Sequence, residues 1–193
     1  MQCCIGRVEA SIEHLSVALE QKPFAATLDG PRIQLVRSSP AYAQQVWEYI
    51  QRDHAMGGSN YSWVESLEDV AKHVVTEPNS ESKDVDYLIL KESKAIGSFH
   101  VHSISYSDLK AEIGYGIEKG EEGNGYVSES LQLVIAELKR LGFNKVVINC
   151  DRNNIRSIQV AKRNGFAQEG LLLQDCVENG CSRDSVIFGK LLR

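Results

Sequence analysis

The spacing of apolar and polar residues along the chain predicts an ordered series of strands and helices. Polar and apolar positions alternate over 32–38, as they do in a half-buried strand. Helical spacing follows over 41–53 and 66–75, and Ser66 with Asp69 is close to a capping box at the start of the second helix. The next three patterns are typical of strands, and they cover residues 85–91, 95–105 and 111–118. The short link between the first two of these strands predicts a hairpin.

From Val127 onward the apolar positions take the period of an amphipathic helix. The pattern continues to Leu141, and Gly142 follows where helices commonly end. The remaining patterns predict a strand, a helix and two closing strands, over residues 145–150, 153–164, 166–174 and 184–192. This order predicts one mixed α/β domain over 31–193, whereas residues 1–30 are expected to form an N-terminal arm of unknown role.

Length and composition fit a soluble protein with one substantial core. The chain has 193 residues, of which 42% are hydrophobic and 24% are charged. No stretch approaches the roughly 18–20 consecutive apolar residues of a membrane span. The N-terminus lacks a basic start followed by a long apolar run, so no signal peptide is expected. We therefore expect a cytoplasmic protein without a membrane partner.

Charge and cysteine content narrow the possible partners. The net charge of −5 argues against nucleic acid, since binding to nucleic acid depends on clustered Lys and Arg. The same charge is compatible with a cationic substrate such as an amine. The five cysteines are an odd number, and they form no C-x-x-C pair or cluster with histidine. The sequence therefore predicts a reduced protein without a metal site.

Two glycines stand at the entrance to the long helix. Gly123 and Gly125 lie between the strand at 111–118 and the helix, a setting in which backbone N–H groups can hold a phosphate. The loop is not a Walker A motif, because no Lys-Ser/Thr pair follows it, and Ser128 stands where G-x-G-x-x-G has its third glycine. A Rossmann-type nucleotide site is also disfavoured, because the loop lies mid-chain after several strands. Taken alone, the pattern favours a tight turn over a phosphate-binding loop.

Two longer motifs carry a family resemblance. The segment "AEIGYGIEKGEEGNGYVSESL" is followed by "DRNNIRSIQVAKRNGF", which contains Asp151, Asn154 and Ser157 and ends at 164–166 with Asn-Gly-Phe. Together they resemble the acetyl-CoA-binding core of the GCN5-related N-acetyltransferases, and most of all the RimJ/RimL type, which acetylates protein N-termini. The resemblance covers residues 31–193. It implies an α/β (α+β) fold with a mixed, mostly antiparallel sheet, a splayed parallel strand pair and about four flanking helices.

The resemblance also implies an acetyl-CoA site that is made largely of backbone. The loop residues expected to hold the pyrophosphate are Glu122, Gly123, Asn124, Gly125 and Tyr126. Pantetheine would lie along the exposed strand edge near Ile117, and Asn154 would hold it or cap its own helix. Two positions depart from the family pattern: Gly120 replaces a Gln or Arg, and Cys176 replaces a glutamate of RimL-type enzymes. Because the loop binds mainly through backbone groups, CoA binding is expected to survive.

Acyl transfer to an amine needs a deprotonated amine, a polarised thioester carbonyl and a protonated leaving thiolate. Glu112 is the candidate to take the amine proton through water, although it can also be a surface residue or bind the substrate's positive charge. The N–H near Ile117 would polarise the carbonyl. By the resemblance, Ser157 is the candidate proton donor, or else a first-turn residue that bonds its own backbone. Gly114 and Gly116 share a strand face with Glu112, and their bare backbone suits either a substrate or close packing.

Other reactive side chains are weaker candidates for a catalytic or metal-binding role. Cys150 could carry an acyl group, but a buried structural thiol is favoured. His100 and His102 share a strand face and supply only two ligands for a metal. Tyr61 and Trp63 lie in the loop between the first two helices, where they would border the acceptor pocket in this family or anchor the core.

These observations predict an N-acetyltransferase that transfers acetyl directly from acetyl-CoA to a primary amine in a ternary complex, without a metal. The first expected acceptor is the α-amine of a protein, such as a ribosomal protein. Two alternatives stay open: a small amine (a polyamine, an amino sugar or an antibiotic) as acceptor, and a CoA-binding module without catalysis. A monomer or a homodimer is expected.

Overall fold

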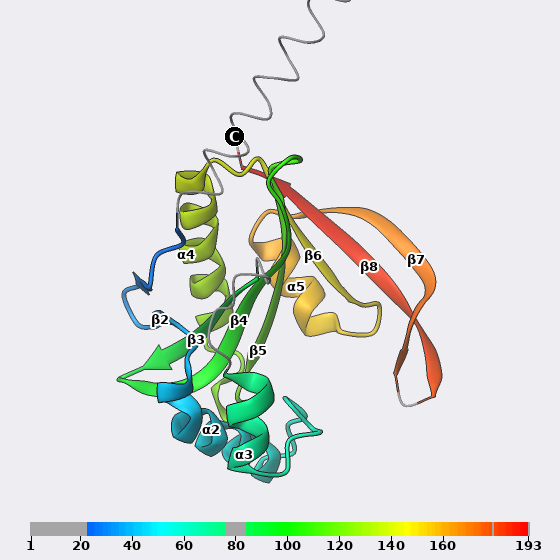
Figure 1. Ribbon diagram of the computed structural model, residues 1–193. Coiled ribbons are helices and arrows are strands. Elements are labelled where there is room, and N and C mark those ends of the chain that lie inside the picture. Colours follow the sequence, from blue (N-terminus) through cyan, green and yellow to red (C-terminus); the bar gives the residue numbers. More distant parts are fainter. Residues whose placement is uncertain (1–22, 76–83, 179, 193) are drawn as a thin grey trace, which may run out of the picture. The chain divides into compact units, whose positions relative to one another are not determined.

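The computed structural model describes residues 23–75, 84–178 and 180–192 (Figure 1). The strands are β1 (Thr27–Asp29), β2 (Gln34–Arg37), β3 (Val85–Lys91), β4 (Lys94–Ser105), β5 (Lys110–Ile117), β6 (Lys145–Asp151), β7 (Ala167–Glu178) and β8 (Cys181–Leu191). The α-helices are α2 (Ala43–Ala55), α3 (Leu67–Asp69), α4 (Tyr126–Leu141) and α5 (Ile155–Arg163). Shorter helical turns are η1 (Pro40–Tyr42), the π-helical η2 (Val70–Val74) and η3 (Lys119–Glu121). The predicted order of elements is confirmed, with one additional strand, β1.

The strands follow one another in the sheet in the order β1-β2-β3-β4-β5-β6-β8-β7. β5 and β6 run parallel, whereas β1–β2, β2–β3, β3–β4, β6–β8 and β7–β8 run antiparallel. The parallel pairing joins Lys110–Glu112 to Lys145–Val147 and stops there, although both strands continue. The predicted α/β class, with a mostly antiparallel sheet and one parallel pair, is therefore confirmed.

The chain divides into two compact units, and β4, β5 and α4 contribute residues to both. Of the described residues, unit 1 holds 23–24, 103–113 and 135–192, and unit 2 holds 25–75, 84–102 and 114–134. None of the helices in these ranges combines the length and the hydropathy of a membrane span.

Unit 2 is organised around the buried face of α2. Val46, Tyr49, Ile50 and Asp53 follow one another at helical spacing and are buried, so the face carries one ionisable group among apolar ones. Each large apolar side chain buried in this way contributes about 1.5–3 kcal/mol of transfer free energy. The core cluster around this face consists of Val36, Val46, Tyr49, Ile50, Val64, Val70, Val75, Leu88, Leu90 and Ala95.

Two local features of unit 2 determine how its strands pair. β1 pairs antiparallel with β2, and the Tyr87 hydroxyl donates to the carbonyl oxygen of Ala25 over 2.8 Å. A strand of three residues is too short for periodicity to reveal, which is why the sequence did not predict β1. The predicted hairpin between β3 and β4 is confirmed, and its turn residues Glu92 and Ser93 both have positive φ (50° and 65°), as a two-residue type I′ turn requires.

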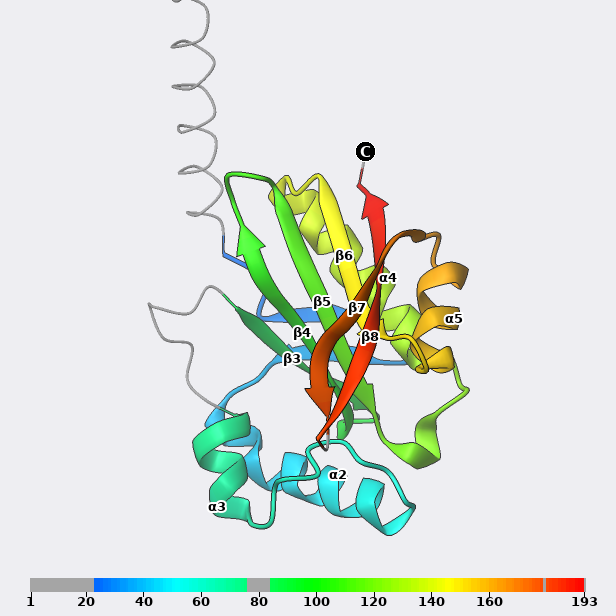
Figure 2. The same cartoon turned by 90° about the vertical axis from the view of Figure 1, so that its right-hand side faces the viewer.

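Unit 1 contains the long hairpin of β7 and β8, which Figure 2 shows as a strongly twisted ribbon. β8 also pairs with β6 along its length, from Lys145 opposite Leu191 to Asp151 opposite Ser185. The register between β7 and β8 shifts between Leu172 and Cys176. At this irregularity the Asp184 carboxylate accepts from the Gln174 backbone N–H over 3.0 Å, and this bond holds the pKa of Asp184 below its usual value.

Candidate active site

The glycine loop of unit 2 has the conformation that only glycine adopts without strain. Gly123 and Gly125 have φ values of 79° and 82°. A Cβ atom on Gly123 would meet no heavy atom within 4 Å, so backbone conformation and not crowding explains this glycine. The Glu129 N–H donates to the Gly125 carbonyl oxygen over 3.1 Å, which is the first intrahelical bond of α4. The first N–H groups of a helix have no intrahelical acceptor, and a helix start of this kind can bind a phosphate.

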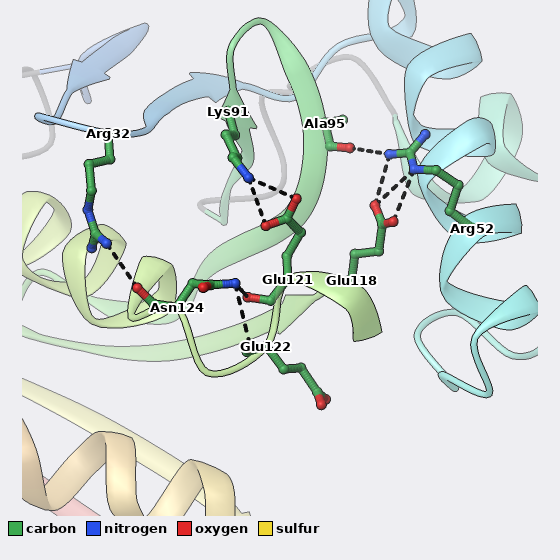
Figure 3. A network of polar contacts seen from close by, with 8 residues as sticks. All are labelled: Arg32, Arg52, Lys91, Ala95, Glu118, Glu121, Glu122 and Asn124. Carbon is green, nitrogen blue, oxygen red and sulfur yellow. Dashed lines mark hydrogen bonds and ion pairs between the residues drawn. The ribbon is translucent and has the colours of Figure 1, made fainter.

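Two cations from distant parts of the chain flank this loop (Figure 3). Arg32 Nη1 donates to the carbonyl oxygen of Asn124 over 2.9 Å, and Lys91 Nζ lies 3.1 Å from both carboxylate oxygens of Glu121. Both cations also lie over the ring of Tyr126, 5.0 Å and 5.3 Å from its centroid. Hydrogen bonding to Glu121 raises the pKa of Lys91, so the ammonium keeps its charge at neutral pH.

Glu129 fixes Arg32 beside the loop. Its carboxylate accepts from Arg32 Nε over 2.7 Å, from the Arg32 backbone N–H over 2.9 Å and from the Ile33 backbone N–H over 3.3 Å. Glu129 is buried in the first turn of α4, where a carboxylate is favoured by the helix dipole. Sequence reasoning missed both cations, because Arg32 reaches Asn124 across 92 residues and Lys91 reaches Glu121 across 30, and such contacts leave no local pattern.

The departure at Gly120 has a steric explanation. A Cβ atom on Gly120 would lie 2.9 Å from Met56 Sδ and 3.0 Å from Met56 Cε, so Met56 fills the space that a side chain would need. Arg32 and Lys91 lie beside the loop as cations, each paired with a carboxylate, Glu129 and Glu121. The Glu122 carboxylate lies 3.8 Å from Lys119 Nζ, and Figure 3 shows it pointing away from the Lys91–Glu121 pair.

The end of β5 is held by a buried ion pair. Arg52 Nη2 lies 2.9 Å from Glu118 Oε2 and donates to the carbonyl oxygen of Ala95 over 2.7 Å (Figure 3). The Glu118 side chain is buried and that of Arg52 half-buried, so removal of either partner would leave an uncompensated charge.

Asp53 connects the loop after α2 to the end of β5 through hydrogen bonds. Its fully buried carboxylate accepts from the backbone N–H groups of Asn60, over 3.0 Å, and Lys119, over 2.7 Å. Asn60 Nδ2 in turn donates to the carbonyl oxygen of Ile117 over 2.8 Å. Glu118 N–H donates to the Ile96 carbonyl of β4, so the preceding N–H, that of Ile117, points to the opposite side of the strand. This orientation agrees with the predicted role of Ile117 at an exposed strand edge.

Unit 1 carries the remaining predicted residues. Asn154 caps α5, and its side-chain oxygen accepts from the Ser157 backbone N–H over 3.0 Å. Ser157 is buried, and its hydroxyl forms a hydrogen bond with the thiol of Cys150 near the end of β6. Glu112 is half-buried in β5, opposite Val147 of β6. Cys176 is exposed at the irregular part of β7, where it pairs with Arg183.

Cys150 is expected to react more slowly with alkylating agents than the exposed Cys176 and Cys181. Burial raises the pKa of the Cys150 thiol more than its hydrogen bond to Ser157 lowers it, so little nucleophilic thiolate forms. Iodoacetamide labelling of the folded protein near pH 8, followed by peptide mass spectrometry, measures the labelling rate of each cysteine. Equal rates in the folded protein would contradict the prediction, and labelling after unfolding provides the control.

The loop after α2 exposes one of the two predicted aromatic residues. Trp63 is 55% exposed and packs edge-on against His73, with ring centroids 6.0 Å apart, so it is not a core anchor. Tyr61 is half-buried and contacts Ser98 of β4. Within the described ranges no group of three or more His, Cys, Asp or Glu side chains could hold a metal.

Comparison with known proteins identifies the family. The family described as "Acetyltransferase (GNAT) domain" matches residues 32–167, which is more than half of the chain. The chain belongs to the GNAT acetyltransferase family. The resemblance carried by the two motifs is thereby confirmed, and with it acetyl-CoA as the cosubstrate of this GNAT protein.

Individual GNAT relatives match nearly the whole chain. The "Ribosomal-protein-serine acetyltransferase" of Escherichia coli (strain K12) is 29% identical over 183 residues, which are 92% of this chain and 95% of that protein. A structure described as "RimL- Ribosomal L7/L12 alpha-N-protein acetyltransferase in complex with Coenzyme A" has a TM-score of 0.75 at 23% identity and covers 86% of this chain and 97% of its own. The "Microcin C7 self immunity acetyltransferase MccE in complex with Acetyl-CoA and AMP" has a TM-score of 0.74 at 24% identity and covers 84% and 93%. These structures show that the GNAT fold is shared.

Proposed function

We propose that this GNAT protein transfers the acetyl group of acetyl-CoA to the N-terminal α-amine of a protein. A ribosomal protein is the first candidate for this acceptor. The observation that carries the proposal is the similarity to the E. coli ribosomal-protein-serine acetyltransferase, which extends over 92% of the chain. It therefore includes residues outside the cofactor motifs, such as the 56–63 loop that would face the acceptor. A ribosomal acceptor would place the reaction in the cytoplasm.

Some residues of the proposed site would bind acetyl-CoA, and others would transfer protons. The backbone N–H groups of 122–126 would hold the pyrophosphate, with Arg32 and Lys91 adding positive charge nearby. The N–H of Ile117 and the side chain of Asn154 would position the pantetheine arm. These assignments agree with the positive φ angles of the loop and with the direction of the Ile117 N–H.

The chemistry requires a proton to leave the amine and another to reach the thiolate. As the amine nitrogen forms the new C–N bond, the thioester C–S bond breaks and the sulfur needs a proton, for which Ser157 is the candidate donor. Glu112 would face the acceptor, as the proton acceptor or as the carboxylate that binds the ammonium. No metal is needed for these steps.

The test of the proposed function is release of CoA thiol by the purified protein with matched panels of acceptors. One panel contains N-terminal peptides of ribosomal proteins and the other contains polyamines, amino sugars and amine antibiotics. Turnover confined to peptides, with mass spectrometry locating the acetyl group on the α-amine, supports the proposal. Turnover confined to small amines overturns it. Thermal stabilisation by acetyl-CoA without turnover on either panel would instead identify a CoA-binding module.

Ser157→Ala is expected to lower kcat about a hundredfold, the lower range for loss of a general acid. The substitution leaves the capping bond between Asn154 and the backbone N–H of residue 157 in place. Thermal stabilisation by acetyl-CoA should therefore persist. Asn154→Ala gives a contrasting result, because it costs about 1 kcal/mol of stability and should weaken acetyl-CoA binding through the lost contact with pantetheine, while it leaves the Ser157 hydroxyl in place. A Ser157→Ala variant with wild-type kcat would refute the assignment.

A further inference from the structure

A continuous chain of four polar side chains crosses one face of β4 in unit 2. His100 Nδ1 lies 2.7 Å from Asp86 Oδ1, and His100 Nε2 lies 3.1 Å from Ser98 Oγ. The Tyr61 hydroxyl donates to Ser98 Oγ over 3.1 Å and lies 3.3 Å from His100 Nε2. Asp86 comes from β3 and Tyr61 from the loop after α2, so three elements build the chain.

The donors and acceptors in this chain can be satisfied in one direction. An ionised carboxylate only accepts, so Asp86 requires the proton of His100 to be on Nδ1. Nε2 is then an acceptor, and the Ser98 hydroxyl can donate to it. The Ser98 oxygen is in turn the acceptor of the Tyr61 hydroxyl. This tautomer is assigned from the bonding pattern. The result is a relay in which protons can move from Tyr61 toward His100.

The relay leads from half-buried Tyr61 through buried Ser98 to the more exposed His100 and Asp86. Ser98 is 3% exposed, whereas the side chains of His100 and Asp86 are 34% and 44% exposed. Burial raises the pKa of Tyr61, so its hydroxyl stays protonated and able to donate at neutral pH. A proton received at Tyr61 can therefore reach solvent through the imidazole of His100.

Two glycines of β5 border the relay for different reasons. A Cβ atom on Gly116 would lie 2.7 Å from Asn60 Oδ1 and 3.7 Å from Ser98 Oγ, so close packing by Asn60 explains this glycine. A Cβ atom on Gly114 would lie 3.7 Å from His102 Nε2 and 3.9 Å from His100 Cβ, which are ordinary contacts. Gly114 is therefore not required by crowding, and it leaves bare backbone beside both histidines.

Charged and titratable groups face the relay from β3, β4 and α2. Asp86 of β3 bonds the ring directly. His102 of β4 and Tyr49 of α2 are the other titratable groups nearby. Tyr49 interacts electrostatically with Tyr61, Asp53 and Glu118. Burial raises the pKa of Tyr49, so it is neutral. The anion closest to the imidazole ring is thus Asp86, which stabilises an imidazolium when one forms.

We propose that the relay of Tyr61, Ser98, His100 and Asp86 receives the proton that the acceptor amine loses. The inference rests on the proposed function and assigns the proton acceptor within it. The ammonium proton passes to the Tyr61 oxygen, the Tyr61 proton to Ser98 Oγ and the Ser98 proton to His100 Nε2. Both hydroxyls are regenerated, one proton is gained by the imidazole and then released to solvent, and no electrons change hands. Glu112 is then not required as the proton acceptor.

The test is the pH dependence of acetyl transfer to an N-terminal peptide by His100→Asn. This variant keeps a donor toward Asp86 and removes the proton acceptor. We expect kcat/KM to fall about a hundredfold at pH 6.5, as for loss of a general base. The loss should shrink above pH 9, because an α-amine with an ordinary pKa of about 8 then arrives neutral. A purely structural role would lower the rate equally at every pH.

Companion variants separate the relay from its alternatives. Tyr61→Phe and Ser98→Ala should show the same pH-dependent loss as His100→Asn, and Glu112→Gln should raise KM more than it lowers kcat. His102→Asn, two residues along the same strand, is the matched control and should change kcat/KM less than threefold. Nitrogen-15 NMR of the wild type should find the Nδ1–H tautomer of His100, and Asp86→Asn should shift it.

Four outcomes of these experiments support or overturn the relay. A pH-dependent loss in His100→Asn with the Nδ1–H tautomer supports the relay. Wild-type turnover with an unaffected His100→Asn overturns the relay and leaves the proposed function in place. An Nε2–H tautomer overturns the direction of proton transfer, whatever the activity. If the wild type acetylates no amine, the proposed function is overturned, and the relay falls with it.

Discussion

Asp53→Ala is expected to lower the free energy of unfolding by about 2–4 kcal/mol, or about 1–2 kcal/mol for each backbone N–H left without an acceptor. The carboxylate is fully buried on α2 and accepts from the N–H groups of Asn60 and Lys119. Alanine removes both acceptors and also the carboxylate against which Gly58 packs directly. Urea denaturation followed by circular dichroism measures the loss.

Asp53→Asn is the matched control for this prediction. The amide keeps one of the two oxygen acceptors and nearly the same volume, so we expect about half of the loss seen with alanine. An alanine variant within about 0.5 kcal/mol of the wild type, the usual range for surface substitutions, would contradict the role given to Asp53. The comparison isolates the hydrogen bonds, because shape changes little between aspartate and asparagine.

Gly123→Val is expected to weaken acetyl-CoA binding about five- to thirtyfold. The φ of Gly123 is 79°, and the left-handed region costs an L-residue roughly 1–2 kcal/mol, more when it is β-branched. If the loop relaxes to a negative φ, its N–H groups turn away from the pyrophosphate, and each 1.4 kcal/mol is worth about a factor of ten in Kd. Isothermal titration calorimetry with acetyl-CoA measures the effect.

Gly180→Val controls for backbone strain alone. Gly180 lies in the turn between β7 and β8 with a φ of 74°, and a Cβ atom there would also meet nothing within 4 Å. Both valine variants should therefore lose similar thermal stability, while only Gly123→Val should lose affinity for acetyl-CoA. An equal Kd for the two variants would show that the conformation of the glycine loop does not matter for binding.

Much of this fold could be predicted because its signals are local. The strand at Val85–Lys91 and the helix at Tyr126–Leu141 match their predicted ranges closely, since each repeats one period over seven residues or more. The capping of a helix by Ser66 is confirmed as well, because its partner Asp69 is only three residues away. The glycine pair was also visible, because positive φ angles select glycine.

The parts that sequence could not predict depend on contacts between distant residues. Arg32 reaches Asn124 across 92 residues, and Lys119 reaches Asp53 across 66. A buried aspartate at a helical position looks like an interruption of the apolar pattern until its two N–H partners are placed beside it. The histidine relay was likewise missed: His100 was considered only as a weak metal ligand, and Tyr61 only as a border of the acceptor pocket or a core anchor, because the members come from three elements.

Met56 and Gly120 form a pair of complementary size. The thioether of Met56 occupies the space into which a side chain at 120 would extend. A side chain at 120 therefore requires the end of Met56, which is flexible and 56% exposed, to move aside. Because residue 56 also begins the loop that would face the acceptor, a substitution at 120 would act on that loop through Met56.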